Sequence, residues 1–238
     1  MSRKYPRPTL RTDQLTIAWQ SSSLLMSYPD ESLLVKLDMI RSASQQLPSS
    51  IGDAIRAFVV HLEETPLTQL QQDYVETFDT RRRCNLFLTY FAHGDTRKRG
   101  LALLRFKQTY LRSGFMLDDS ELPDHLCVVL EFAATVDQDL GRRLILDHRA
   151  GLELLRLSLH DTGSPWAVVV DAVTGTLPPL RGDERDAVRR LAAEGPPEEE
   201  VGLAPFGTPE FSPSASAPPG TPDGRAFLPM PTFPGARG

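Results

Sequence analysis

The stretch that decides the fold is residues 51–78, IGDAIRAFVVHLEETPLTQLQQDYVETF, in which two apolar stripes follow one another. The first stripe ends before Pro66 and consists of Ile51, Ile55, Phe58, Val59 and Leu62. The second consists of Leu67, Leu70, Tyr74 and Phe78. Apolar residues that recur every three or four positions line one face of an α-helix. The stretch therefore predicts two consecutive amphipathic helices.

The same spacing continues on both sides of this stretch, across residues 10–194. After Gly94, the residues that trace one face of a helix are Leu101, Leu104, Gln108 and Leu111, and Gly114 can cap that helix. A single long helix that ends near Asp161 is predicted from Leu140, Leu144, Leu152, Leu155 and Leu159. Short spacers separate the stripes, as in compact helical bundles. The sequence thus predicts an all-α, single-domain helical bundle.

Residues 86–91, LFLTYF, do not fit this pattern. The run is short and rich in aromatic residues, which is typical of a β-strand. However, the chain offers no good second strand to pair with it, so we expect a buried helix.

The composition changes near Gly195, because proline and glycine recur every few residues from there to Gly238. Such a segment cannot bury enough apolar surface to offset the entropy cost of ordering it. We expect a flexible N-terminus at residues 1–11, an all-helical domain at residues 12–194 and a disordered tail at residues 195–238.

Charge and cysteine content narrow the class of protein. The net charge is -5 and the pI about 5.6, which argues against a general nucleic-acid binder. The two cysteines, Cys84 and Cys127, form no CxxC pair, as expected in a reducing compartment. No apolar run approaches the length of a membrane span, and we find no signal peptide. We expect a cytoplasmic protein that is not inserted in a membrane.

No group of residues predicts catalysis or metal binding. The string Asp161-Thr162-Gly163 occurs in aspartic proteases, but it is present once and lies between two predicted helices, so we expect a turn. The histidines lack the spacing of metal ligands, and there is no phosphate-binding loop or nucleophile elbow. We therefore predict a protein that is not an enzyme.

Two basic triplets, at residues 81–83 and 97–99, allow more than one interpretation. They could form a solvated face, or they could contact an anion or a partner, because arginine binds carboxylates in a bidentate manner. The alternative function is a small helical regulator that binds nucleic acid through these arginines, although the aromatic residues nearby look buried.

Five segments occur together in one order: residues 74–79 (YVETFD), 86–91 (LFLTYF), 94–100 (GDTRKRG), 121–126 (ELPDHL) and 130–134 (LEFAA). Together they resemble the nitrate reductase delta-subunit family, the molybdenum cofactor assembly chaperones called NarJ, in its actinobacterial type. The resemblance covers about residues 12–175.

The resemblance implies a fold shared with other molybdoenzyme maturation chaperones, and a cytoplasmic protein absent from the finished enzyme. It implies binding of the apo catalytic (α) subunit of nitrate reductase, including its N-terminal segment, before membrane docking. The α–β complex and cofactor-biosynthesis proteins are further expected partners. No cofactor is expected to stay bound, and contact with the client's bis-molybdopterin guanine dinucleotide would be transient.

A chaperone of this kind would hold a client helix in an apolar groove with a charged rim. We predict that Tyr74, Phe78, Tyr90 and Phe91 line or support this groove. The predicted polar rim consists of Glu76, Asp79, Asp95, Arg97, Arg99, Glu121 and Asp124.

Overall fold

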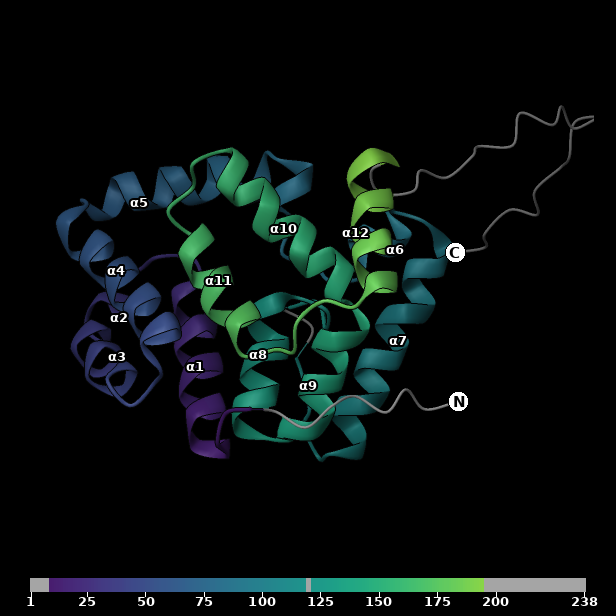
Figure 1. The fold of residues 1–238 in the computed structure, drawn as a ribbon, viewed down its shortest axis with the longest axis horizontal. Helices are drawn as coiled ribbons and strands as arrows, with labels where there is room; N and C mark the ends of the chain where they lie inside the picture. The colour runs from purple at the N-terminus through teal and green to yellow at the C-terminus, as the bar shows by residue number, and fades with distance from the viewer. Residues whose placement is uncertain (1–8, 119–120, 195–238) are drawn as a thin grey trace, which may run out of the picture. The chain divides into compact units, whose positions relative to one another are not determined.

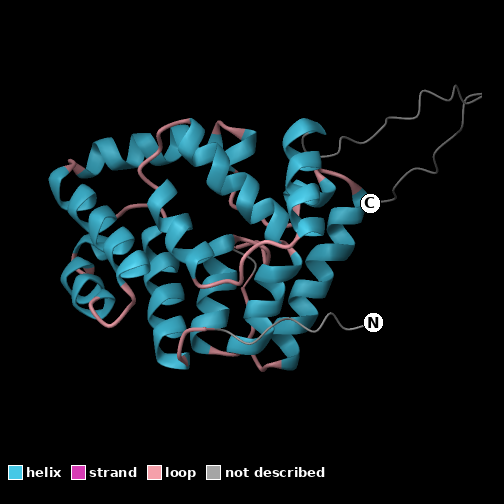
Figure 2. Cartoon of the chain, viewed as in Figure 1, coloured by secondary structure: helices cyan, strands magenta, loops and turns pink. Residues whose placement is uncertain are grey.

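The computed structural model describes residues 9–118 and 121–194, and in these ranges the regular elements are helices joined by short loops (Figures 1 and 2). The α-helices are α1 (Thr12–Leu25), α2 (Glu31–Leu34), α3 (Leu37–Ser44), α4 (Ser49–Glu64), α5 (Leu67–Tyr74), α6 (Tyr90–His93), α7 (Arg97–Arg112), α8 (Leu126–Thr135), α9 (Gln138–Asp147), α10 (Arg149–Asp161), α11 (Ala167–Gly175) and α12 (Gly182–Glu194). Two further helical turns differ in width from an α-helix. They are the wider π-helix η1 (Val75–Asp79) and the tighter 3₁₀-helix η2 (Arg82–Cys84). The all-α prediction is confirmed.

Helix α1 lies between α3 and α8 and contacts α3, α4, α8 and α11 (Figure 1). Its Trp19 is fully buried, and the indole N–H donates a hydrogen bond of 2.9 Å to the hydroxyl of Thr176, just beyond α11. A buried indole N–H without a partner would be costly, so this bond fixes the position of α11 against α1.

The first of the two helices predicted from residues 51–78 is α4, and all five residues of its apolar stripe are buried. It begins after Pro48 and ends before Pro66, as expected where proline cannot donate a backbone hydrogen bond. Burying a side chain such as Ile55 or Phe58 stabilises the fold by about 1.5–3 kcal/mol. The stripe therefore anchors α4 against α3 and α11.

Glycines with positive φ end α6, α7 and α10, and those after α7 and α10 share one motif. Gly114 has φ 73°, and the N–H of Phe115 donates to the carbonyl of Tyr110, which closes α7 with a Schellman motif. Gly163 has φ 66° and ends α10 in the same way, with Ser164 donating to Leu159. The Asp161-Thr162-Gly163 string is thus a turn between helices, as predicted.

The expectation of a buried helix at residues 86–91 is wrong for most of that run. Leu86 and Phe87 are extended, and Phe87 forms an isolated antiparallel bridge with His125. Helix α6 begins only at Tyr90. The partner of Phe87 is therefore His125, a loop residue that immediately precedes α8. The segment around His125 has no strand pattern in its sequence.

The prediction of a single long helix that ends near Asp161 is also wrong. The segment forms two helices, α9 and α10, which meet at His148. The Nδ1–H of His148 donates to the carbonyl of Leu144, and its ring packs against Phe106 of α7 at 5.0 Å between centroids. This contact with a distant helix accompanies the change of direction, and no glycine or proline marks it in the sequence.

Residues 1–8, 119–120 and 195–238 lie outside the described residues. The expected flexibility of the first residues and the expected disorder of the proline-rich tail therefore stay predictions. Within the described ranges, no helix is both long and apolar enough to cross a bilayer.

Candidate functional site

The predicted aromatic residues Tyr74 and Phe78 belong to a buried cluster. Their rings lie 5.7 and 5.4 Å from the indole of Trp166, which also packs against Phe58 at 5.6 Å. The cluster joins α5, η1 and α4 to the residue that precedes α11. Because these rings are buried, any part they play in partner binding is to support a surface from below.

The chain changes from α5 into the π-helix η1 directly after Tyr74. This wider turn leaves Glu76 and Asp79 exposed while it buries Thr77 and Phe78. Glu76 accepts a hydrogen bond of 2.6 Å from Arg81 of the first basic triplet. Single π-turns are rare and are found frequently at functional sites.

Acidic residues act on the buried hydroxyl of Tyr74. Burial raises the pKa of Tyr74 well above its ordinary value, and the negative charges of Asp79 and Glu121 raise it further. Burial likewise raises the pKa of Cys127 to about 12, with added effects of Glu121 and Glu131. Although they are distant in the sequence, Asp79 and Glu121 thus act on the buried phenol, and Glu121 and Glu131 act on the buried thiol.

An apolar residue is present in the same region. Tyr28 is half-exposed, and its ring stands edge-on to that of Tyr74, with centroids 5.4 Å apart. The hydroxyl of Tyr74 donates to the carbonyl of Met26 at 3.1 Å. We refer to Tyr28, Asp79, Glu121 and Glu131 as the acidic surface.

Tyr28 and Glu131 were not among the predicted site residues. A signal for Glu131 was available, since it is the single charged residue of the otherwise apolar helix α8. Nothing in the sequence marks Tyr28, because its position depends on the packing of the loop after α1 against α5.

A second group of predicted residues is held together by Asp124, which is fully buried. Its carboxylate accepts hydrogen bonds from the backbone N–H of Thr89 at 3.1 Å and from the Thr89 hydroxyl at 2.5 Å. Backbone bonds from Leu88 to Asp124 and from Leu126 to Leu86 extend this connection. Asp124 thus joins residues 86–89 to the start of α8.

Arg99 completes this group from the first turn of α7. Its guanidinium lies over the rings of Phe87 and Tyr90, at 5.3 and 5.8 Å from their centroids. It donates to Asp95 at 3.1 Å and lies 3.9 Å from the carboxylate of Asp124. A guanidinium packed on aromatic faces and close to two carboxylates stabilises the local fold.

The basic triplet at residues 97–99 is therefore divided: Arg97 and Lys98 are exposed, whereas Arg99 is largely buried. Phe91 is buried against α10, where a Cβ atom on Gly151 would meet the Phe91 ring at 2.9 Å.

The structure thus places the predicted site residues in two groups that meet at residues 121–125. One contains Tyr74, Phe78, Asp79 and Glu121, and the other contains Tyr90, Asp95, Arg99 and Asp124. The charges of both Glu121 and Asp124 oppose the effect of burial, which lowers the pKa of His125. Phe91 adjoins the second group, since its ring stands edge-on to that of Tyr90 with centroids 6.2 Å apart, and Glu76 pairs with Arg81. A role for any of the eleven in partner binding stays a prediction.

No cluster of histidine, cysteine, aspartate and glutamate suited to a metal ion occurs among residues 9–118 and 121–194. Both cysteines are buried as free thiols.

Comparison with known proteins gives a consistent family. The model of the nitrate reductase delta subunit matches residues 44–171. The Bacillus subtilis protein named "Probable nitrate reductase molybdenum cofactor assembly chaperone NarJ" is 31% identical over 71% of this chain and 92% of its own length. The Escherichia coli K12 protein named "Nitrate reductase molybdenum cofactor assembly chaperone NarJ" is 33% identical over 63% of this chain and 64% of its own.

A third relative is longer. The Mycobacterium tuberculosis H37Rv "Nitrate reductase-like protein NarX" is 39% identical over 69% of this chain. The aligned part covers 25% of the length of that protein. The family model covers more than half of the chain, and the Bacillus relative aligns over nearly its whole length. The chain therefore belongs to the nitrate reductase delta-subunit family.

Proposed function

We propose that this protein is a chaperone that binds the apo catalytic subunit of a respiratory nitrate reductase and keeps it competent for insertion of the molybdenum cofactor. The observation that carries the proposal is family membership, since two of the relatives are named as assembly chaperones of that kind. The client would be released to the membrane only after loading.

The N-terminal segment of the catalytic subunit is the proposed contact, and the acidic surface is its proposed site. Asp79, Glu121 and Glu131 would attract a basic segment, which raises the association rate more than the affinity. Tyr28 would supply an apolar contact above the buried ring of Tyr74. The buried aromatic cluster beneath would keep this surface rigid, which lowers the entropy cost of binding.

The finer parts of the proposal concern cofactor, further partners and location. The chaperone would catalyse no reaction and keep no permanent cofactor, and it would meet the client's bis-molybdopterin guanine dinucleotide transiently. The α–β complex and cofactor-biosynthesis proteins would be its other partners, in the cytoplasm. The nucleic-acid alternative has no observation in its favour, because Arg99 is turned inward and Arg81 is paired with Glu76.

A deletion strain tests the function. Cells that lack this protein should retain the nitrate reductase polypeptides but contain enzyme with little molybdenum and little activity, and the wild-type gene should restore both. A strain whose enzyme is fully loaded without the protein would contradict the proposal.

A further inference from the structure

Helix α7 carries an apolar stripe on its outer face. Leu101, Leu104 and Leu111 are 65%, 50% and 60% exposed, and their spacing places them on one side of the helix. The opposite side is the one that packs, through Ala102, Phe106 and Tyr110. The predicted helix is therefore present, but the leucines that predicted it face solvent. A surface helix usually has charged and polar residues there.

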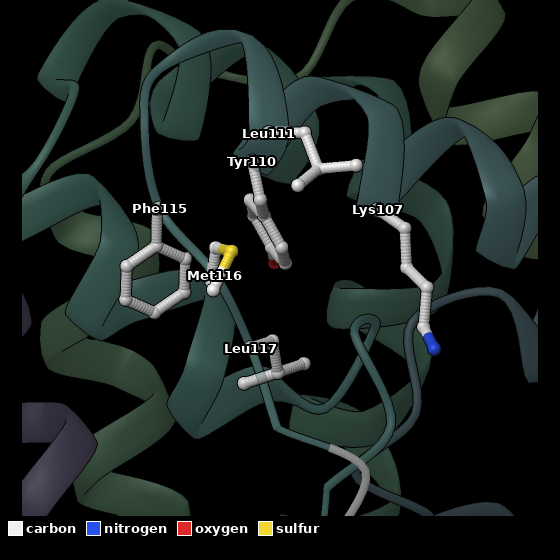
Figure 3. A pocket seen from close by; sticks show the side chains of 6 residues that line it. All are labelled: Lys107, Tyr110, Leu111, Phe115, Met116 and Leu117. Atoms are coloured by element: carbon white, nitrogen blue, oxygen red, sulfur yellow. The ribbon is translucent and has the colours of Figure 1, made fainter.

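A pocket of about 180 Å³ continues the stripe at the C-terminal end of α7 (Figure 3). It is lined by Lys107, Tyr110, Leu111, Phe115, Met116 and Leu117. Leu111 belongs to both the stripe and the pocket, and Met116 beside it is highly exposed. The hydroxyl of Tyr110 donates to the carbonyl of Pro123 at 2.6 Å, so Tyr110 presents an apolar ring to the pocket.

The charged residues of helix α7 itself have one sign. The sixteen residues of α7 include six basic residues and no acidic residue. Arg99 is turned inward, whereas Arg105 and Arg112 border the stripe on one side and Lys107 on the other, as their positions on the helix require. The acidic residues nearest in sequence, Asp95 and Asp118, lie beyond the two ends of the helix.

We propose that this face, the α7 surface, binds an acidic amphipathic helix of a partner protein. Leucines at three- and four-residue spacings on the partner would pack on Leu101, Leu104 and Leu111, with one side chain in the pocket. Aspartate or glutamate flanking them would pair with Arg105, Lys107 and Arg112. This proposal is independent of the proposed client site. The acidic surface would bind a basic segment, whereas the α7 surface would bind an acidic helix.

Two other occupants fit the observations less well. Nucleic acid would pair its phosphates with the basic residues but would leave the leucine stripe and the pocket uncovered. An anionic membrane would cover the leucines, as it does for basic amphipathic helices, but it makes no use of a shaped pocket. A protein helix uses the stripe, the charges and the pocket together.

The test uses the full chain and a fluorescent, end-blocked peptide of about five helical turns, with leucines at i, i+3, i+7 and i+10 and glutamates beside them. Fluorescence anisotropy should show binding of this peptide. Binding should weaken at least tenfold in Leu104→Ser/Leu111→Ser, and also in Arg105→Glu/Lys107→Glu. The matched control Val35→Ser/Met39→Ser removes exposed apolar residues from another surface and should bind as the wild type does.

A peptide with lysine in place of each glutamate should bind far more weakly. Thermal melts of each variant would show that the exposed substitutions leave the fold intact. The proposal is overturned by absence of peptide binding, or by equal binding in all variants. It is also overturned if only phosphatidylglycerol vesicles or a single-stranded oligonucleotide bind to the α7 surface.

Discussion

The carboxylate of Asp124 holds Thr89 by two hydrogen bonds, one to the backbone N–H at 3.1 Å and one to the hydroxyl at 2.5 Å. Thr89 and Asp124 are both fully buried. Removing the carboxylate would leave the donors of Thr89 without a partner and would deprive Arg99 of a neighbouring negative charge. Since an unsatisfied buried group is costly, this contact adds to the backbone bonds that join residues 86–89 to the start of α8.

Asp124→Ala should therefore lower the free energy of unfolding by about 3 kcal/mol. Chemical denaturation monitored by circular dichroism measures the change. The matched control is Asp95→Ala, which removes an exposed carboxylate from the same arginine and should have a much smaller effect. An equal decrease in the free energy of unfolding of the two variants would show that the buried hydrogen bonds to Thr89 do not add to the stability.

Two helical glycines should respond in opposite directions to substitution by alanine. A Cβ atom on Gly141 would lie 2.4 Å from the Cβ of Ala133, where α9 packs on α8, so Gly141→Ala should lower the melting temperature. Gly100 in α7 has open space at this position, and Gly100→Ala should raise stability by about 0.5–1 kcal/mol. Differential scanning calorimetry of the pair decides the point. A stabilising Gly141→Ala would contradict the close packing of α8 and α9.

The stability should depend on pH through His148. Burial lowers the pKa of His148 below its ordinary value, against smaller opposing effects of Leu144, Asp147 and Asp124. The folded state thus holds a neutral imidazole ring. The contribution of this ring to the free energy of unfolding is complete above the pKa of about 6.5 that histidine has in the unfolded chain. That contribution is lost as the pH falls from there toward the lower pKa of the folded state.

Unfolding free energies at pH 7.5 and 5.5 test this effect. His148→Asn keeps a donor for the carbonyl of Leu144 but cannot be protonated, so the stability difference between the wild type and this variant should narrow at the lower pH. A difference that is the same at both pH values would mean that His148 does not titrate on unfolding.

Most of the fold could be predicted, because the helices of the core repeat their apolar residues at regular spacing. Helix α4 and its five buried residues follow directly from that spacing. The exceptions are contacts between distant segments. The bridge of Phe87 with His125 and the break at His148 depend on partners that are remote in the sequence, which local patterns do not reveal.

The candidate site could be predicted only in part. Arg99 and Asp124 bring residues 94–100 close to residues 121–126, but exposure could not be predicted from residue type. Asp124 is fully buried and Arg99 largely so, because Asp124 accepts two hydrogen bonds from Thr89 and Arg99 packs on the rings of Phe87 and Tyr90. In α7 the leucines are exposed and the aromatic residues are buried, which is the opposite of what the leucine stripe alone suggests.

The central claim is that the protein holds the unloaded catalytic subunit of nitrate reductase through the acidic surface. Isothermal titration calorimetry of the full chain with the N-terminal peptide of that subunit, and with the full apo subunit, tests it most directly. The account predicts binding of both, weakened in the triple variant Asp79→Asn/Glu121→Gln/Glu131→Gln and unchanged in the control Asp186→Asn, which alters an exposed carboxylate of α12. Absence of binding to both the peptide and the apo subunit would contradict it.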